Sequence, residues 1–109
     1  MANTFKLKTK ANVGVTTVGI YTAPAATTTV VIGITLSNTS GSGVNVGVGI
    51  TRAGTTEDVK LLKNAPIPQG SSLEFMGGNK VVLETNDQIN VDSETNNSVD
   101  ASLTIMEIT

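Results

Sequence analysis

Apolar and polar residues alternate with a period of two along most of the chain. This period places successive side chains on opposite faces of an extended strand, and helical periodicity is hard to find anywhere in the sequence. Val44 to Thr51 shows the clearest pattern, with Val or Ile at every second position and Asn or Gly between them. Other predicted strands are Phe5–Lys10, Val15–Tyr21, Thr28–Ser37, Val59–Leu62, Leu73–Phe75, Val81–Glu84, Ile89–Val91 and Val99–Ile105.

The alternation also predicts which side chains are buried. In the first segment Phe5 and Leu7 alternate with three lysines, so we expect the two apolar side chains to be buried. Lys6, Lys8 and Lys10 would then form an exposed row, a device that discourages strands from pairing edge to edge. Three later sets are each expected to share one face: Val30, Ile32, Ile34 and Leu36; Val44, Val46, Val48 and Ile50; and Val99, Ala101, Leu103 and Ile105.

Residues that favour turns separate these segments. Residues 38–43 should reverse the chain, and 77–79 and 86–87 mark later corners. Pro66 and Pro68 make the stretch from Pro66 to Gln69 a crossover or an edge, because proline cannot donate a hydrogen bond within a sheet. About eight short strands separated in this way are typical of an antiparallel β-sandwich or jelly roll. We therefore predict an all-β fold, with residues 1–109 as one β-sandwich domain and residues 1–12 as an N-terminal strand or arm.

Composition excludes several kinds of chemistry. The 109 residues contain no Cys and no His, which removes thiol nucleophiles, Cys/His zinc sites and Ser-His-Asp triads. We expect no enzymatic activity and no cofactor. The net charge of −2 favours neither nucleic acid nor an anionic membrane as a partner. No apolar block of signal-peptide length follows the N-terminal lysines, and Val30–Leu36 is too short to span a bilayer, so we expect a soluble protein made in the cytosol.

Acidic and amide residues near the C-terminus are one candidate site. Carboxylate and amide oxygens suit calcium, but the spacing here fits no EF-hand loop, and short polar residues also dominate ordinary turns. A hydrolase with paired carboxylates has no support beyond the presence of acids, and one Tyr with no Trp offers little for stacking on a sugar. The residues concerned are Asp87, Asp92, Glu94, Asp100, Asn86, Asn90, Asn96 and Asn97.

Three surfaces are candidates for contact with another protein. The lysine row could face an acidic partner, although an exposed lysine row is more often a solvated edge. Gly47 and Gly49 leave a flat stripe on one face of their strand, explained either by a bulge beside a closely packed neighbour or by the backbone of another subunit. The third candidate is the stretch Pro66, Ile67, Pro68 and Gln69.

Several short motifs follow one another from Tyr21 to the C-terminus. The chain has Tyr21-Thr-Ala-Pro24 at one end and Ile105-Met-Glu-Ile108 at the other, with the more specific Lys63-Asn-Ala-Pro-Ile-Pro68 between them. With these motifs it resembles a family of small virion structural proteins of tailed bacteriophages. It departs from that family at Val59–Leu62, where tyrosines are frequent, and at Glu84–Asp87, where a glycine commonly precedes the aspartate. Further matching pieces are Thr27–Leu36, Asn38-Thr39, Gly70–Glu74 and Lys80–Leu83.

The resemblance implies a component of a virus particle. The leading hypothesis is a capsid decoration or cement protein that binds and stabilises the assembled phage head as a homo-oligomer, such as a trimer. Its partners would be the major capsid protein or other virion proteins, and it would reach the virion after synthesis in the host cytoplasm. The alternatives are a neck, tail or fibre component, acting as an adaptor or host-contact module, and a carbohydrate-binding module.

Overall fold

The alternating pattern forms extended strands over almost all of the described chain. The computed structural model describes residues 3–54, 57–74 and 80–109, and every regular element within these ranges is a β-strand. The prediction of an all-β fold is therefore confirmed. The strands are β1 (Asn3–Val13), β2 (Val18–Thr22), β3 (Thr28–Asn38), β4 (Val44–Thr51), β5 (Asp58–Ile67), β6 (Ser72–Glu74), β7 (Val81–Leu83), β8 (Gln88–Ser93) and β9 (Val99–Ile108).

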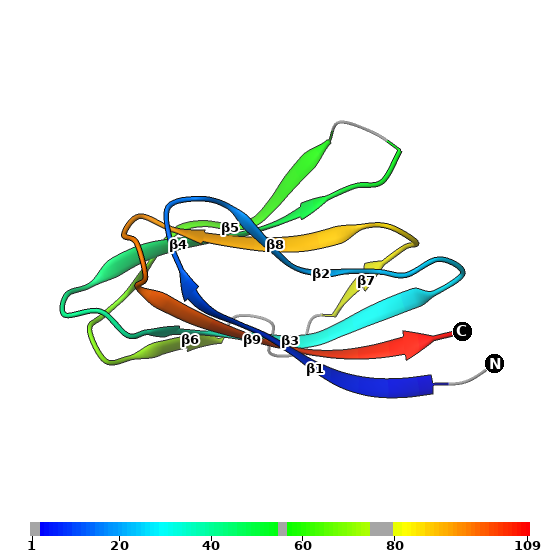
Figure 1. The fold of residues 1–109 in the computed structure, drawn as a ribbon, viewed down its shortest axis with the longest axis horizontal. Helices are drawn as coiled ribbons and strands as arrows, with labels where there is room; N and C mark the ends of the chain where they lie inside the picture. The colour runs from blue at the N-terminus through cyan, green and yellow to red at the C-terminus, as the bar shows by residue number, and fades with distance from the viewer. Residues whose placement is uncertain (1–2, 55–56, 75–79) are drawn as a thin grey trace.

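The strands form two antiparallel sheets that lie one above the other (Figure 1). The first sheet has the order β1-β9-β3-β6, and β7 pairs with β3 on the same side as β6. The second sheet has the order β2-β8-β4-β5. If β6 and β7 are taken as two pieces of one edge strand, the chain visits the sheets in the sequence first, second, first, second, second, first, second, first. This is the path of a jelly roll, so the predicted β-sandwich is confirmed.

Branched aliphatic side chains fill the space between the sheets. Ile34 and Leu103 of the first sheet and Val48 and Ile89 of the second are at most 1% exposed, and each such residue contributes roughly 1.5–3 kcal/mol of hydrophobic stabilisation. The buried rows predicted for β4 and β9 are confirmed. The buried core also includes Val13, Tyr21, Ala23, Val31, Leu36, Val44, Val46, Ile50, Ile67, Leu83, Val91, Val99, Ala101 and Ile105.

The buried face predicted for β3 is only half right. Ile34 and Leu36 are buried as expected, but Val30 and Ile32 lie on the other face, and Val31 is buried instead. The cause is a shift in the pairing of β3 with β9 between Val31 and Gly33. A β-bulge adds one residue to a strand and so exchanges its inward and outward positions.

The edges of the sheets agree with the proline pattern. β5 is an edge strand of the second sheet, as the prolines at 66 and 68 predicted. The predicted alternation at Phe75 and the turn at 77–79 lie outside the described residues. The described part of the chain contains no helix that is long and apolar enough to cross a membrane.

Candidate interaction surface

β1 is an edge strand of the first sheet and turns its lysines inward. It pairs with β9 in continuous register over Asn3–Lys10, and Lys8 and Lys10 lie opposite Leu103 and Ala101, two residues of the buried face of β9. Directly opposite residues in antiparallel strands share one face of the sheet. The lysine row therefore lies on the side of the sheet that faces the core.

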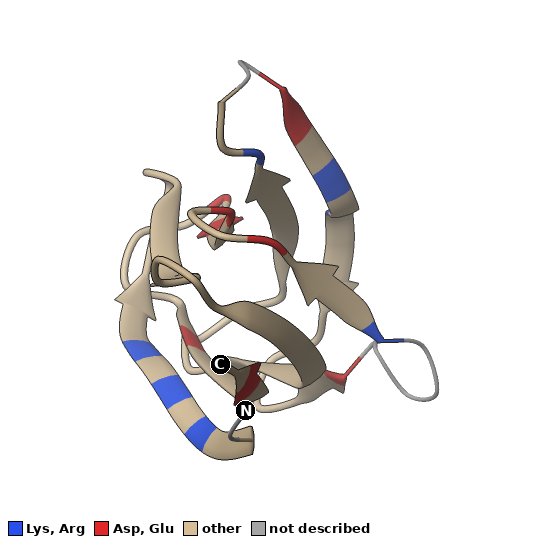
Figure 2. Cartoon of the chain, turned by 90° about the vertical axis from the view of Figure 1, so that its right-hand side faces the viewer, with Lys and Arg blue, Asp and Glu red and all other residues tan. Residues whose placement is uncertain are grey.

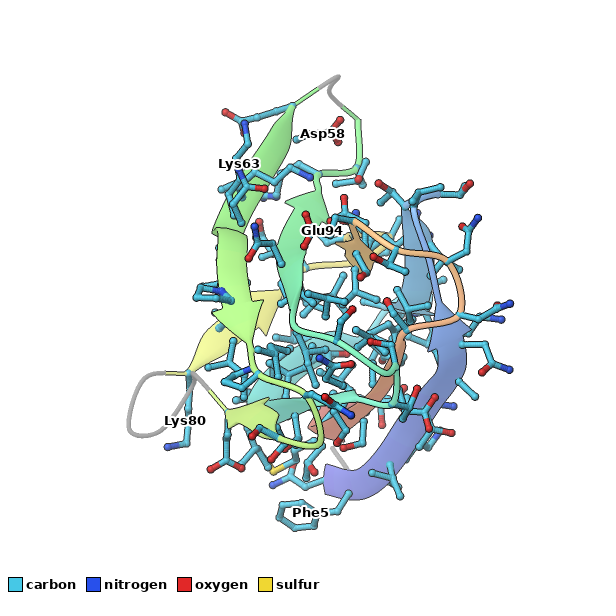
Figure 3. All side chains as sticks on the ribbon, turned by 90° about the vertical axis from the view of Figure 1, so that its left-hand side faces the viewer. Phe5, Asp58, Lys63, Lys80 and Glu94 are labelled. Carbon is cyan, nitrogen blue, oxygen red and sulfur yellow. The ribbon has the colours of Figure 1, made fainter. Side chains whose placement is uncertain are left out.

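The predicted burial of Phe5 and Leu7 is wrong. Their side chains are 69% and 65% exposed, respectively, because they point from the outer face of the sheet. Figure 3 shows the Phe5 ring pointing away from the rest of the molecule. The alternation of β1 was read correctly, but its two faces were assigned the wrong way round.

The orientation of β1 follows from a buried carboxylate at the end of β9. The Glu107 side chain is 9% exposed, and its Oε1 lies 2.9 Å from Lys6 Nζ. The Tyr21 hydroxyl donates to Oε2 over 2.6 Å, and Thr29 Oγ1 lies 2.7 Å from that hydroxyl. A buried carboxylate is stable only when it is paired and hydrogen-bonded. If the apolar face of β1 pointed inward, Glu107 would lose Lys6.

The network shifts the titration of both acidic groups. Burial and the hydrogen bond to Glu107 raise the pKa of Tyr21 to about 12. Hydrogen bonds from Tyr21 and Lys6 lower the pKa of Glu107 below its ordinary value. Glu107 is thus charged and Tyr21 neutral at neutral pH, which is the state that this network requires.

Sequence reasoning missed Glu107, although the pattern contains a signal for it. The buried positions of β9 recur every second residue from Val99 to Ile105, and two residues further the same face reaches Glu107. An acid at a buried position requires a cation nearby. That requirement would have turned the lysines of β1 inward.

The three lysines follow one another along the edge and form the blue bands on β1 in Figure 2. Lys6 is 42% exposed even though it pairs with Glu107. Lys8 Nζ lies 6.0 Å from the centre of the Tyr21 ring, and Lys10 is exposed. Three cations therefore share this edge with one buried carboxylate, Glu107.

An apolar row crosses the outer face of the first sheet. Phe5 lies opposite Met106, Met106 opposite Val30, and Val30 opposite Val82. Leu7 lies beside this row on the same face. We call these five residues the outer apolar row. Val82 is 57% exposed, so both ends of the row are open to a partner.

Gly47 and Gly49 are both buried, and the neighbours that cover them belong to the same chain. A Cβ atom at Gly47 would lie 2.6 Å from Asp92 Oδ1, and one at Gly49 would lie 3.0 Å from the carbonyl oxygen of Val59. The pairing of β4 with β5 is irregular here. This arrangement matches the bulge beside a closely packed neighbour, so we do not include the two glycines in the proposed contact surface.

The stretch from Pro66 to Gln69 leaves β5 and crosses to the first sheet. Pro66, Pro68 and Gln69 are exposed, while Ile67 is 1% exposed and belongs to the core. The Ile67 carbonyl accepts a hydrogen bond from Asn38 Nδ2. Three residues of this stretch are therefore accessible for contact, whereas Ile67 packs in the core.

The acidic residues considered for calcium hold separate groups of the chain in place. Asp92 accepts a hydrogen bond from the Thr17 hydroxyl, and Glu94 and Asp100 accept bonds from the backbone amides of Asn45 and Asn12. Within residues 3–54, 57–74 and 80–109, no three Asp or Glu side chains come together in a group that could hold a metal ion. The carboxylates of the described chain thus do not converge on one calcium site.

Asp87 has a structural role at the far edge of the sandwich. Its carboxylate accepts hydrogen bonds from the amides of Ala53 and Glu84, and its Oδ2 lies 3.1 Å from Arg52 Nε. Burial alone would raise the pKa of Asp87, but these donors hold it below its ordinary value. A hollow of about 360 Å³ opens beside this group and Val82. The two acids that line this hollow, Asp87 and Glu84, are therefore engaged with backbone amides and with Arg52.

Comparison with known proteins identifies a shared fold. No protein-family model and no curated protein matches the sequence. A protein from the disulfide-linked pili of Bacillus endospore appendages is 14% identical, with a TM-score of 0.57 over 99% of this chain and 87% of that chain. A chain in the structure of infectious bursal disease virus, Gx strain, is 15% identical, with a TM-score of 0.57 over 96% of this chain but only 32% of that chain.

A third structure is less similar. A chain from the capsid asymmetric unit of cyanophage Pam1 is 10% identical over 96% of this chain and 84% of that chain, with a TM-score of 0.40. A score this low does not establish a shared fold. At these identities the first two likenesses concern the fold alone: the chain is similar in fold to a chain from a pilus and to about a third of a chain from a virus.

Proposed function

We propose that the protein is a structural component of a phage particle, a capsid decoration or cement protein that binds the assembled head as a homo-oligomer. The observation that carries the proposal is the outer apolar row, in which Phe5, Leu7 and Val82 are exposed to solvent on the outer face of the jelly roll. Exposed apolar residues that form a continuous patch are typical of protein–protein contact surfaces. The resemblance to phage virion proteins supports this choice of partner.

The chemistry of the described residues is consistent with a binding role. The acids Asp87, Asp92, Glu94 and Glu107 each hold a backbone or side-chain group in place. A protein that binds only the mature lattice stabilises that lattice by mass action and needs no reactive group. The folds of the pilus and virus chains also show that similar sandwiches occur in assembled structures.

The proposal is tested by mixing the purified protein with expanded phage heads that lack it and sedimenting the heads. We expect the protein to sediment with the heads and the F5S/V82S variant to bind at least about tenfold more weakly, because a few apolar side chains carry most of the affinity of a contact surface and these two are exposed for contact. V15S is the matched control, since Val15 is 55% exposed and lies outside the row. Equal binding by F5S/V82S and the unchanged protein would contradict the role of the row.

Copy number separates the head from other parts of the particle. A decoration protein should be present in numbers comparable to the major capsid protein in a stained gel of purified virions. A few copies per particle, with immunogold label on the tail, would instead indicate the neck, tail or fibre. Specific binding to a glycan array, with no binding to heads, would favour a carbohydrate-binding module.

A further inference from the structure

The four edges of the sandwich differ in how they are protected from pairing with another chain. β2, β6 and β7 are short, at five, three and three residues. β5 is longer, but Pro66 and two shifts in its register interrupt it. β1 has neither proline nor irregularity over Asn3–Lys10, and β9 is its only strand partner in the described chain. Unpaired, regular edges are templates for an added strand.

The lysine row decides which strand can be added to β1. If a second copy approached edge to edge about a two-fold axis normal to the sheet, lysines would lie opposite lysines on the inner face. Like charges directly opposite each other destabilise an antiparallel pair. An acidic strand would gain from the same positions, because Lys10 is exposed and Lys8 is half-buried, whereas Lys6 is already paired with Glu107.

The outer face of β1 adds a second requirement. Phe5 and Leu7 alternate with the lysines and are exposed on the outer face. The side chains of the added strand that alternate with its acids would therefore lie against Phe5 and Leu7. Directly opposite side chains on one face are the unit of stabilisation in a sheet. A strand that satisfies both faces of β1 alternates acidic residues with apolar ones.

We propose that β1 is a docking edge for an extended segment of another protein in which acidic and apolar residues alternate. The segment extends the first sheet, with its acids opposite Lys8 and Lys10 and its apolar residues opposite Phe5 and Leu7. Main-chain hydrogen bonds supply affinity in this mode, and the alternate side chains supply specificity. The inference deepens the proposed function by naming the chemistry of the partner, and it depends on that function only for the source of the segment.

The test uses three short peptides and the full-length protein. The first alternates glutamate with valine, the second has lysine in place of each glutamate, and the third has the composition of the first in scrambled order. We expect the glutamate peptide to bind about tenfold more tightly than either of the others, because opposite-charge pairs replace like-charge pairs. Amide chemical shifts in NMR should change along Asn3–Lys10 and not along β5.

Charge variants test the role of the lysines. K8Q/K10E should abolish the preference for the glutamate peptide, whereas K60Q/K63E on β5 should leave it unchanged. Both variants change exposed or half-buried residues only, and a circular dichroism spectrum checks that each is folded. Shifts of β1 amides that grow with protein concentration in the absence of peptide would instead indicate self-pairing.

Each negative outcome has a separate meaning. The inference is overturned if the glutamate peptide binds no better than the lysine peptide, if the scrambled peptide binds equally well, or if the shifts lie away from β1. Binding to phage heads by a protein that fails this test would leave the proposed function standing without the inference. If the protein prefers the glutamate peptide but does not bind phage heads, the result would support the inference and contradict the proposed function.

Discussion

The two long edge strands, β1 and β5, lie at edges of different sheets and avoid uncontrolled pairing in different ways. β5 is interrupted by shifts in register and by Pro66, which makes it a poor template for any added strand. β1 is regular, and it is the charges of Lys6, Lys8 and Lys10 that discourage uncontrolled pairing at this edge. Irregularity closes an edge to every partner, whereas charge closes it to a like-charged strand and leaves it open to an opposite one. The difference therefore marks β1 as the edge available for specific recognition.

The largest effect expected from a polar residue concerns the anchor that orients β1. Glu107→Ala removes the acceptor for Lys6 and Tyr21 and should lower the free energy of unfolding by about 3 kcal/mol, since it breaks a buried charge network. Glu84→Ala is the control, because Glu84 is 73% exposed in its pair with Arg52. That variant should lose less than about 0.5 kcal/mol. Urea unfolding measures both, and equal losses would contradict the anchoring role of Glu107.

A pH titration of stability tests the same network. The pKa of Tyr21 is raised to about 12 in the folded protein, so the stability it contributes is present below pH 10 and is lost as the pH rises towards 12, by about 2 kcal/mol. Tyr21→Phe should lack this alkaline decline. The lowered pKa of Glu107 affects stability at acidic pH. The stability that Glu107 contributes is present above its ordinary pKa and is lost as the pH falls through its pKa in the folded protein. An alkaline decline that is the same in Tyr21→Phe would contradict the assignment.

The close approach of β5 to β4 can be tested at a glycine. Gly49→Ala should cost about 1 kcal/mol, because the new Cβ would lie 3.0 Å from a backbone carbonyl of β5 and the strand must shift. Gly33→Ala in β3 is the matched control, since a Cβ there meets no atom within 4 Å. Thermal unfolding compares the two variants. A loss at Gly33 equal to that at Gly49 would show that the cost does not come from β5.

The smallest effect on stability is expected on the outer face of β1. Phe5→Ser should change the free energy of unfolding by less than about 0.5 kcal/mol, because a side chain that is 69% exposed contributes little to the core. Ile34→Ala, at a position that is 1% exposed, should cost about 2–5 kcal/mol by comparison. A large loss from Phe5→Ser would mean that this residue packs in the fold and is not free to contact a partner.

Period-two alternation predicted the strands, and in some of them it also predicted the buried face correctly. β4 and β9 show this, because all four aliphatic residues predicted to be buried in each strand are buried. β3 failed at Val30 and Ile32, since nothing in a local pattern reveals that a strand shifts register by one residue against its neighbour. The pairing partner of the bulge, β9, lies about seventy residues further along the chain.

The candidate site was harder to predict than the core. The three lysines were identified, but their direction depends on Glu107, about a hundred residues away in sequence. The outer apolar row could not be predicted, because Phe5, Met106, Val30 and Val82 come from four strands and meet only once the strand order is known. Alternation specifies which residues share a face, whereas the choice of the buried face is made by tertiary contacts.

Amide hydrogen exchange along β1 tests the central claim most directly, with the protein alone and bound to purified phage heads. We expect the amides of Asn3–Lys10 that point away from β9 to exchange rapidly in the free protein and to be protected at least about tenfold in the complex, because a new strand covers them. The amides of β5 should be unchanged. Protection confined to β5 or to the loops, with β1 still exchanging freely on the particle, would contradict the account.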